Sequence, residues 1–206
     1  MEQRTPEWFA ARLGRVTASR VADMMARTKT GYGASRANYM AELICERLTG
    51  VPAERFSNAA MAWGTETEPQ ARAMFTLTTG LSVEEAGFAI HPRISELGAS
   101  PDGLIGADGL IEIKCPNTAT HIETLLSDAV PQKYVLQMQT QMVCTGREWC
   151  DFVSFDPRLP DEMQIWIKRV NRDDEVIAEI EREAGAFLAE TETKMTALRG
   201  KYSEAA

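Results

Sequence analysis

Histidine and cysteine are scarce in this chain of 206 residues, which holds two histidines and four cysteines. No two of the cysteines form a Cys-x-x-Cys pair, so the sequence does not favour a structural zinc site. Reduced thiols in a cytoplasmic protein are the expected state. No apolar run is long enough to cross a bilayer, and the first residues resemble no signal peptide. We therefore expect a cytoplasmic protein without a membrane partner.

Basic residues are outnumbered, with 22 Lys and Arg against 30 Asp and Glu and a net charge of −8. An acidic chain argues at first sight against a nucleic-acid partner. The charge is uneven, however, because residues 1–55 hold nine Arg and Lys against six acids, which leaves −11 on the remainder. This distribution fits a protein that contacts phosphate on one surface, although charge alone favours an ordinary solvated surface.

Hydrophobic periodicity predicts an α/β protein in which helices are followed by a mixed sheet, interrupted by one helix, and then by a last helix. Helices are expected over residues 5–26 with a break near Gly14, 38–49, 65–79, 131–144 and 173–198. Strands are expected over 83–90, 149–155 and 163–170, and a hairpin over 100–115 with Asp108-Gly109 as its turn. Residues 28–35 are expected to form a mobile loop. We expect one domain over 1–206, with parts at 1–55, 56–170 and 171–206.

The most informative stretch lies in the predicted hairpin, where Asp102 is followed by Glu112 and Lys114. Side chains alternate across a strand, so Glu112 and Lys114 share one face and the isoleucines beside them point to the other. Two carboxylates beside a lysine at a sheet edge can hold a divalent cation and activate a water. This pattern indicates metal-dependent phosphodiester cleavage. A surface hairpin with a Glu–Lys pair is the alternative, because so short a string also recurs by chance.

The chemistry suggests a role for each of these residues. Asp102 and Glu112 are candidate ligands of a magnesium ion, and the carbonyl of Ile113 is a third candidate oxygen. Lys114 can orient or deprotonate the attacking water, and its ammonium can stabilise developing negative charge.

Two helical segments add further candidates. Glu68 stands near the start of a predicted helix and can bring another carboxylate to the metal, or it is simply an acid favoured by the helix dipole. Gln137 and Gln141 share a face of a later helix. A glutamine there can hydrogen-bond the water or the lysine, with a solvated helix face as the alternative.

Together these motifs resemble the phage lambda exonuclease family, also called YqaJ-type viral recombinases, of the PD-(D/E)xK nuclease superfamily. The resemblance covers the chain from Trp8 to about Pro157. It implies an α/β fold with a central mixed β-sheet flanked by helices, like that of restriction endonucleases. The motifs are Trp8…Arg12-Leu13-Gly14…Thr17-Ala18-Ser19, Ala62-Trp63-Gly64…Glu68, Ser100-Pro101-Asp102-Gly103-Leu104, Glu112-Ile113-Lys114-Cys115-Pro116, Tyr134…Gln137-Met138-Gln139 and Asp156-Pro157-Arg158.

The resemblance implies an alkaline-type exonuclease that degrades the 5′-ended strand of linear double-stranded DNA to mononucleotides. Magnesium is the implied cofactor, with Mn²⁺ as a substitute. By the same resemblance, Asp102 and Glu112 would ligate metal, Lys114 would act on the water, Glu68 would support a second metal, and Gln137 would position the water or the lysine.

The resemblance also assigns DNA contacts, mainly within the helical, end-binding part at residues 1–55. Arg12 and Ser19 would hold the terminal 5′-phosphate. Met61 matches an apolar wedge between the strands, and Lys29 belongs to a basic DNA-contacting loop over residues 27–36. A surface arginine and a core methionine are the alternative interpretations of Arg12 and Met61.

The implied partners are a linear duplex with a 5′-phosphate, two further copies of the chain in a homotrimeric ring, and a phage single-strand annealing protein. The implied location is the cytoplasm of a bacterial host, from a phage or prophage gene. Two other hypotheses remain, an endonuclease of the same superfamily and a non-catalytic DNA-binding protein on this fold. Arg12 and Ser19 favour the exonuclease, because an endonuclease has no terminal phosphate to hold. The complete set of acids with Lys114 argues against a non-catalytic protein.

Overall fold

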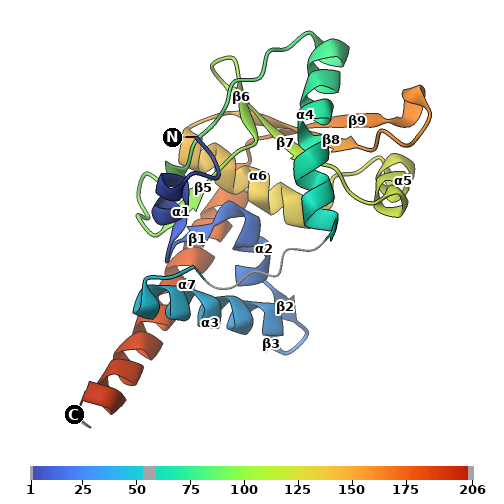
Figure 1. The fold of residues 1–206 in the computed structure, drawn as a ribbon. Coiled ribbons are helices and arrows are strands. Elements are labelled where there is room, and N and C mark those ends of the chain that lie inside the picture. Colours follow the sequence, from blue (N-terminus) through green and yellow to red (C-terminus); the bar gives the residue numbers. More distant parts are fainter. Residues whose placement is uncertain (1, 53–58, 204–206) are drawn as a thin grey trace.

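The computed structural model describes residues 2–52 and 59–203 of the chain (Figure 1). Its helices are α1 (Pro6–Arg12), α2 (Val21–Met24), α3 (Ala34–Thr49), α4 (Ala59–Thr79), α5 (Thr118–Ser127), α6 (Gln132–Thr145) and α7 (Asp174–Ser203), with 3₁₀ turns η1 (Ala18–Arg20) and η2 (Asp161–Met163). Its strands are β1 (Val16–Thr17), β2 (Arg27–Thr28), β3 (Gly31–Tyr32), β4 (Ala89–Ile90), β5 (Leu97–Ala99), β6 (Gly103–Ile105), β7 (Gly109–Lys114), β8 (Trp149–Phe155) and β9 (Ile165–Asn171). Among these helices, none combines the length and the apolar character that a membrane crossing requires.

The central sheet has the strand order β6-β7-β8-β9. Strands β7 and β8 are parallel, whereas β6 and β9 pair antiparallel with their neighbours, so the sheet is mixed as predicted. Parallel neighbours need a long crossover, and here α5 and α6 lie between the two strands in the chain. The crossover brings a helix back to the strand that carries Glu112 and Lys114.

The two faces of the central sheet pack against different helices. Ile111 and Ile113 of β7 belong to a buried cluster with Ala71 and Phe75 of α4. Leu110, on the other face, packs with methionines of α6. The predicted alternation along β7 is therefore confirmed, and Glu112 lies on the face that α6 covers.

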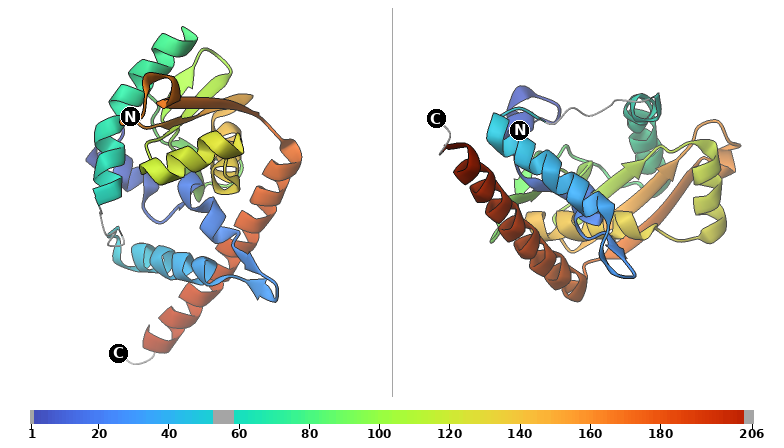
Figure 2. Two further views of the ribbon diagram at one scale, coloured as in Figure 1. Left: turned by 90° about the vertical axis from the view of Figure 1, so that its right-hand side faces the viewer. Right: turned by 90° about the horizontal axis from the view of Figure 1, so that it is seen from below.

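A second core joins the N-terminal helices to the C-terminal one. Val21, Tyr39 and Leu43 from α2 and α3 are buried against Ile180 and Phe187 of α7. Figure 2 shows α3 crossing α7 at this core. Strands β1 and β5 pair in parallel beside it, with β4 antiparallel to β5. The same core thereby supports the segment that leads from β5 into the predicted catalytic hairpin.

Most long elements match the expectations, and the differences concern short ones. The helix expected over 5–26 breaks at Gly14, whose φ is +68°, but a strand and a 3₁₀ turn lie between α1 and α2. The expected mobile loop over 28–35 is wrong, since it contains the β2–β3 hairpin and the start of α3. Helices α3 and α4 also begin several residues before the expected starts.

Two expectations about the sheets need correction, and two further elements were not predicted. The strand expected over 83–90 consists only of β4 and an isolated bridge between Glu84 and Leu104. The hairpin turn uses Gly106, with φ of +54°, whereas Gly109 already pairs with Ile105 in the ladder. Strand β5 and helix α5 were not expected from the sequence. Strand β5 has only three residues, and its parallel partner β1 lies far from it in the chain.

Candidate active site

Glu112 lies at the centre of the site and has no solvent exposure. Its carboxylate accepts hydrogen bonds from two amides of α6, Gln137 to Oε1 at 2.7 Å and Gln141 to Oε2 at 2.6 Å. The ammonium of Lys114 also pairs with Oε1. A buried carboxylate requires such partners, because an unpaired charge is strongly disfavoured inside a protein. Gln141 is itself fully buried, so the alternative of a solvated helix face fails for it.

Asp102 lies between β5 and β6 and contacts β7 near the end of that strand. Its Oδ2 accepts a hydrogen bond from the main-chain N–H of Ile113 at 2.7 Å. Burial raises the pKa of Asp102 to about 8, the charge of Glu112 adds to this rise, and Lys114 opposes it. The two carboxylates are thus close enough to repel each other, which is the situation that a bound cation relieves.

Lys114 completes this group at the end of β7. Its pKa is raised, because Glu112 and Asp102 together outweigh the opposing effect of burial. The ring of Tyr134, on α6, lies 5.2 Å from its nitrogen. The side chain is therefore held as a cation beside both carboxylates.

Glu68 approaches the site from α4, where two arginines hold it. Arg72 donates to Oε1 at 3.4 Å and Arg4 to Oε2 at 3.2 Å. Its charge also contributes to the raised pKa of Asp102. A cavity of about 190 Å³ lies at this point, lined by Glu68, Arg72, Asp102 and the segment 2–4 among others. Sequence reasoning missed Arg72, although Glu68 and Arg72 form an i,i+4 pair on a helix.

The donor set fits magnesium. Asp102 and Glu112 supply hard carboxylate oxygens beside the main chain of Ile113. Among residues 2–52 and 59–203, no cluster of three or more His, Cys, Asp and Glu side chains could hold a metal ion. Magnesium is typically bound by one or two carboxylates, with waters and substrate phosphates as its other ligands. Two carboxylates therefore suit this ion better than one that needs a closed protein cage.

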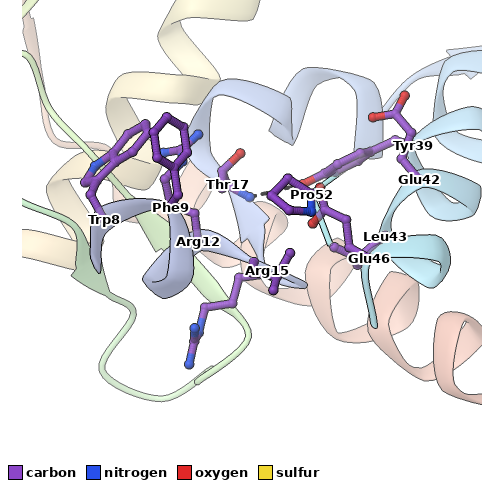
Figure 3. A pocket seen from close by; sticks show the side chains of 11 residues that line it. Trp8, Phe9, Arg12, Arg15, Thr17, Tyr39, Glu42, Leu43, Glu46 and Pro52 are labelled. Atoms are coloured by element: carbon purple, nitrogen blue, oxygen red, sulfur yellow. Dashed lines mark hydrogen bonds between the residues drawn. The ribbon is translucent and has the colours of Figure 1, made fainter. Parts of the chain in front are cut away.

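Arg12 is connected to the catalytic segment by Ser100, two residues before Asp102. Arg12 donates to the hydroxyl of Ser100 at 3.3 Å, and the indole N–H of Trp8 donates to the same hydroxyl at 2.9 Å. The guanidinium stacks on the Trp8 ring at 4.1 Å. Figure 3 shows Trp8 and Arg12 beside Thr17 at a pocket of about 220 Å³. The predicted end-binding arginine thus contacts the segment that carries Asp102.

The other residues predicted to contact DNA are Ser19, Lys29 and Met61, and they lie in different parts of the structure. The hydroxyl of Ser19 lies 3.4 Å from that of Thr17, which lines the same pocket as Arg12. Lys29 is exposed at the tip of the β2–β3 hairpin. Met61 lies within α4, but its side chain is outside the described residues.

Comparisons with known proteins identify the family of this chain. The model of the YqaJ-like viral recombinase domain matches residues 7–148. The chain belongs to this family. The YqaJ-like domain thus includes Arg12, Glu68, Asp102, Lys114 and Gln137, and the family is that of lambda exonuclease and related nucleases.

Solved structures similar to this YqaJ-like chain include exonucleases. The alkaline exonuclease LHK-Exo from Laribacter hongkongensis is 59% identical, with a TM-score of 0.91, over 98% of this chain and 100% of the other. LHK-Exo in complex with dAMP matches with the same identity and coverage and a TM-score of 0.92. A phage-related exonuclease from Haemophilus somnus is 18% identical over 89% of this chain and 96% of its own, with a TM-score of 0.74, which shows a shared fold. No curated protein matches the chain.

Proposed function

We propose that the protein is a magnesium-dependent 5′→3′ exonuclease acting on linear double-stranded DNA. It would degrade the 5′-ended strand to mononucleotides and leave a 3′-ended strand for recombination by annealing. One observation carries this proposal. Arg12 bonds to Ser100, and Ser100 lies two residues before Asp102, which contacts the strand that carries Glu112 and Lys114. LHK-Exo, of similar length and 59% identical, is an alkaline exonuclease, and its complex holds a nucleoside monophosphate.

The residues of the chain would divide the reaction between them. Asp102, Glu112 and the carbonyl of Ile113 would hold the cation, with Glu68 nearby. When bound, Mg²⁺ or Mn²⁺ would polarise the phosphate and lower the pKa of the attacking water. Lys114 would orient this water and stabilise the negative charge that develops on the phosphate. Gln137 and Gln141 would fix the Glu112 carboxylate.

End recognition would come from the N-terminal part. A guanidinium binds phosphate oxygens through paired N–H donors, and Arg12 is already oriented by Trp8 and Ser100. Ser19 would add a hydroxyl to the same phosphate. An endonuclease has no need of such a contact, which is why Arg12 favours the exonuclease over a relative that cuts internally.

The proposed assembly is a homotrimeric ring around DNA, acting with a phage single-strand annealing protein in a bacterial cell. A ring reconciles an acidic chain with a DNA substrate, since only the lining of its channel needs to be basic. Light scattering of the purified protein gives the mass of the assembly, and a monomer at working concentration would contradict the ring.

The deciding experiment is digestion of linear duplex in Mg²⁺, with and without a 5′-phosphate. We expect the phosphorylated end to be degraded much faster, and Arg12→Ala to lose this preference. Equal rates on both ends would remove Arg12 and Ser19 from the site. Covalently closed circular DNA is the matched control, and its rapid loss would show an endonuclease. Binding without any digestion would show a non-catalytic protein.

A further inference from the structure

Arg72 joins two predicted metal-site residues that come from different elements. Its Nη2 donates to the main-chain carbonyl of Asp102 at 2.5 Å and to the Glu68 carboxylate at 3.4 Å. Glu68 is on α4, whereas Asp102 is in the segment between β5 and β6. One guanidinium therefore fixes the distance between a helix and the loop that carries the catalytic aspartate.

The packing around Arg72 leaves its guanidinium little freedom. A Cβ atom built at Gly103 would lie 2.9 Å from Nη1 of Arg72 and 2.3 Å from the side chain of Val83. Glycine after Asp102 is therefore what allows the guanidinium to approach the main chain so closely. The isolated bridge between Glu84 and Leu104 also holds this stretch.

The guanidinium of Arg72 also lies at the cavity beside Asp102. Its Nη1 is buried and has no hydrogen-bond acceptor among the described residues. Arg72 lines the cavity together with Glu68 and Asp102. By contrast, Arg4 contacts only the Glu68 carboxylate in this group and is more than half exposed. Of the two arginines on Glu68, only Arg72 also contacts the Asp102 segment.

We propose that Arg72 is a positioning residue of the metal site, which holds Asp102 and Glu68 in the arrangement that a divalent cation requires. This role rests on the proposed function, because it concerns the same site. The alternative role is competition, in which Arg72 occupies Glu68 and keeps the cation from it. Removal of Arg72 would then tighten metal binding. The two roles predict changes of opposite sign.

Calorimetric titration of Mn²⁺ into the full-length, DNA-free protein distinguishes them. Loss of a residue that orients metal ligands typically weakens binding about 10- to 100-fold, and we expect this for Arg72→Ala. Arg72→Lys should weaken Mn²⁺ binding less than Arg72→Ala does, because an ammonium keeps the charge but not the planar fork that reaches both acceptors. Arg182→Ala is the control, since the one ion pair of Arg182 in the described part of the chain is an exposed one with Glu179 at 3.8 Å. Thermal melting of each variant checks its folding.

The outcomes separate the two proposals. Weaker Mn²⁺ binding in both Arg72 variants, with a matching rise in the Mg²⁺ concentration needed for half-maximal digestion, supports the role. Equal or tighter binding in Arg72→Lys overturns it, and this variant decides if Arg72→Ala does not fold. If Arg4→Ala weakened Mn²⁺ binding as much as Arg72→Ala, the contact of Arg72 with Asp102 would contribute nothing, and the proposed role would be overturned. If the Arg72 variants bind Mn²⁺ as the wild type does, the positioning role fails. The proposed function still stands in that case, provided that the wild-type protein digests DNA in Mg²⁺.

Discussion

Gln141 donates a hydrogen bond of 2.6 Å to Oε2 of Glu112 in the interior, where neither side chain meets solvent. Gln137, one helical turn earlier, donates to the other oxygen of the same carboxylate. The two amides fix the carboxylate plane from one face of α6. Because Gln141 is fully buried, its role is to orient Glu112 rather than to contact DNA.

We predict that Gln141→Leu slows digestion by roughly tenfold or more. A hydrogen bond to a charged group contributes about 1.5–3 kcal/mol, and 1.4 kcal/mol corresponds to a factor of ten in rate. The measurement is the rate of mononucleotide release at saturating Mg²⁺ and DNA, together with urea unfolding.

Gln139→Leu is the matched control, because Gln139 is equally buried on the same helix but bonds to Asn171 and Asp173 near the start of α7. We expect Gln139→Leu to lower the free energy of unfolding. The molecules that remain folded should digest DNA at the wild-type rate. A Gln141→Leu enzyme as fast as the wild type would show that Glu112 needs only one amide.

We predict that Lys114→Ala abolishes digestion while DNA binding persists. Positioned proton-transfer groups typically contribute a factor of about 10² to 10⁴, so the residual rate should fall at least that far. Digestion and fluorescence anisotropy with a labelled duplex measure the two effects. Lys168→Ala is the control, since the one ion pair of Lys168 within residues 2–52 and 59–203 is with exposed Asp128 at 3.2 Å. Unchanged digestion by Lys114→Ala would refute the assigned mechanism.

The central strands could be predicted because their signals are local. Alternation along β7 placed Glu112 and Lys114 on one face, and the structure confirms this placement through their shared contact. Strand β8 matched its expected limits for the same reason. The family motifs then connected the strand to Glu68 and Gln137, and these residues do lie around Asp102 and Glu112.

Contacts between distant segments could not be predicted from periodicity. The contact of Arg12 with Ser100 spans 88 residues, and the contact of Arg72 with Asp102 spans 30. The β2–β3 hairpin was expected to be a loop because it is rich in glycine and polar residues. It is ordered by α7, since Arg27 and Tyr32 both bind the buried carboxylate of Glu183.

This ordering leads to a prediction for Lys29. Arg27 binds Glu183 and Arg36 binds Glu190, so two of the three basic residues of the hairpin region are already paired. Lys29 makes no ion pair within the described ranges and is exposed at the tip. We expect Lys29→Ala to weaken DNA binding and to reduce the salt slope by about one, as loss of one phosphate contact does.

Anisotropy titrations at several salt concentrations measure this slope. Arg36→Ala is the contrasting variant, because the buried Arg36 bonds to the Met24 carbonyl and stacks on Phe187. It should lower the free energy of unfolding, whereas Lys29→Ala should leave it unchanged. An unaltered salt slope in Lys29→Ala would mean that the tip of the hairpin does not meet DNA.

The last prediction concerns the stability of the turn after β8, where Arg158 wraps around the buried Asp156. Arg158 donates its main-chain N–H and its Nε to Oδ1 at 3.0 and 2.7 Å, and its Nη2 to Oδ2 at 2.9 Å. Burial alone would raise the pKa of Asp156, but the bonds from Arg158 and Thr118 outweigh it and lower the pKa to about 2. The ionised carboxylate is therefore more stable in the folded protein than in the unfolded chain.

A lowered pKa in the folded state means that the stabilisation is complete above the unfolded value of about 3.9 and disappears as the pH falls toward 2. Asp156→Asn should thus be less stable than the wild type by about 2 kcal/mol near neutral pH, and the difference should shrink between about pH 4 and pH 2. Urea unfolding across this range measures it. Asp174→Asn is the control, because Asp174 forms an exposed pair with Arg172 and should give only a small difference at any pH. A difference between wild type and Asp156→Asn that stays constant down to pH 2 would show that the charge of Asp156 contributes nothing, and that the turn is held by its neutral hydrogen bonds.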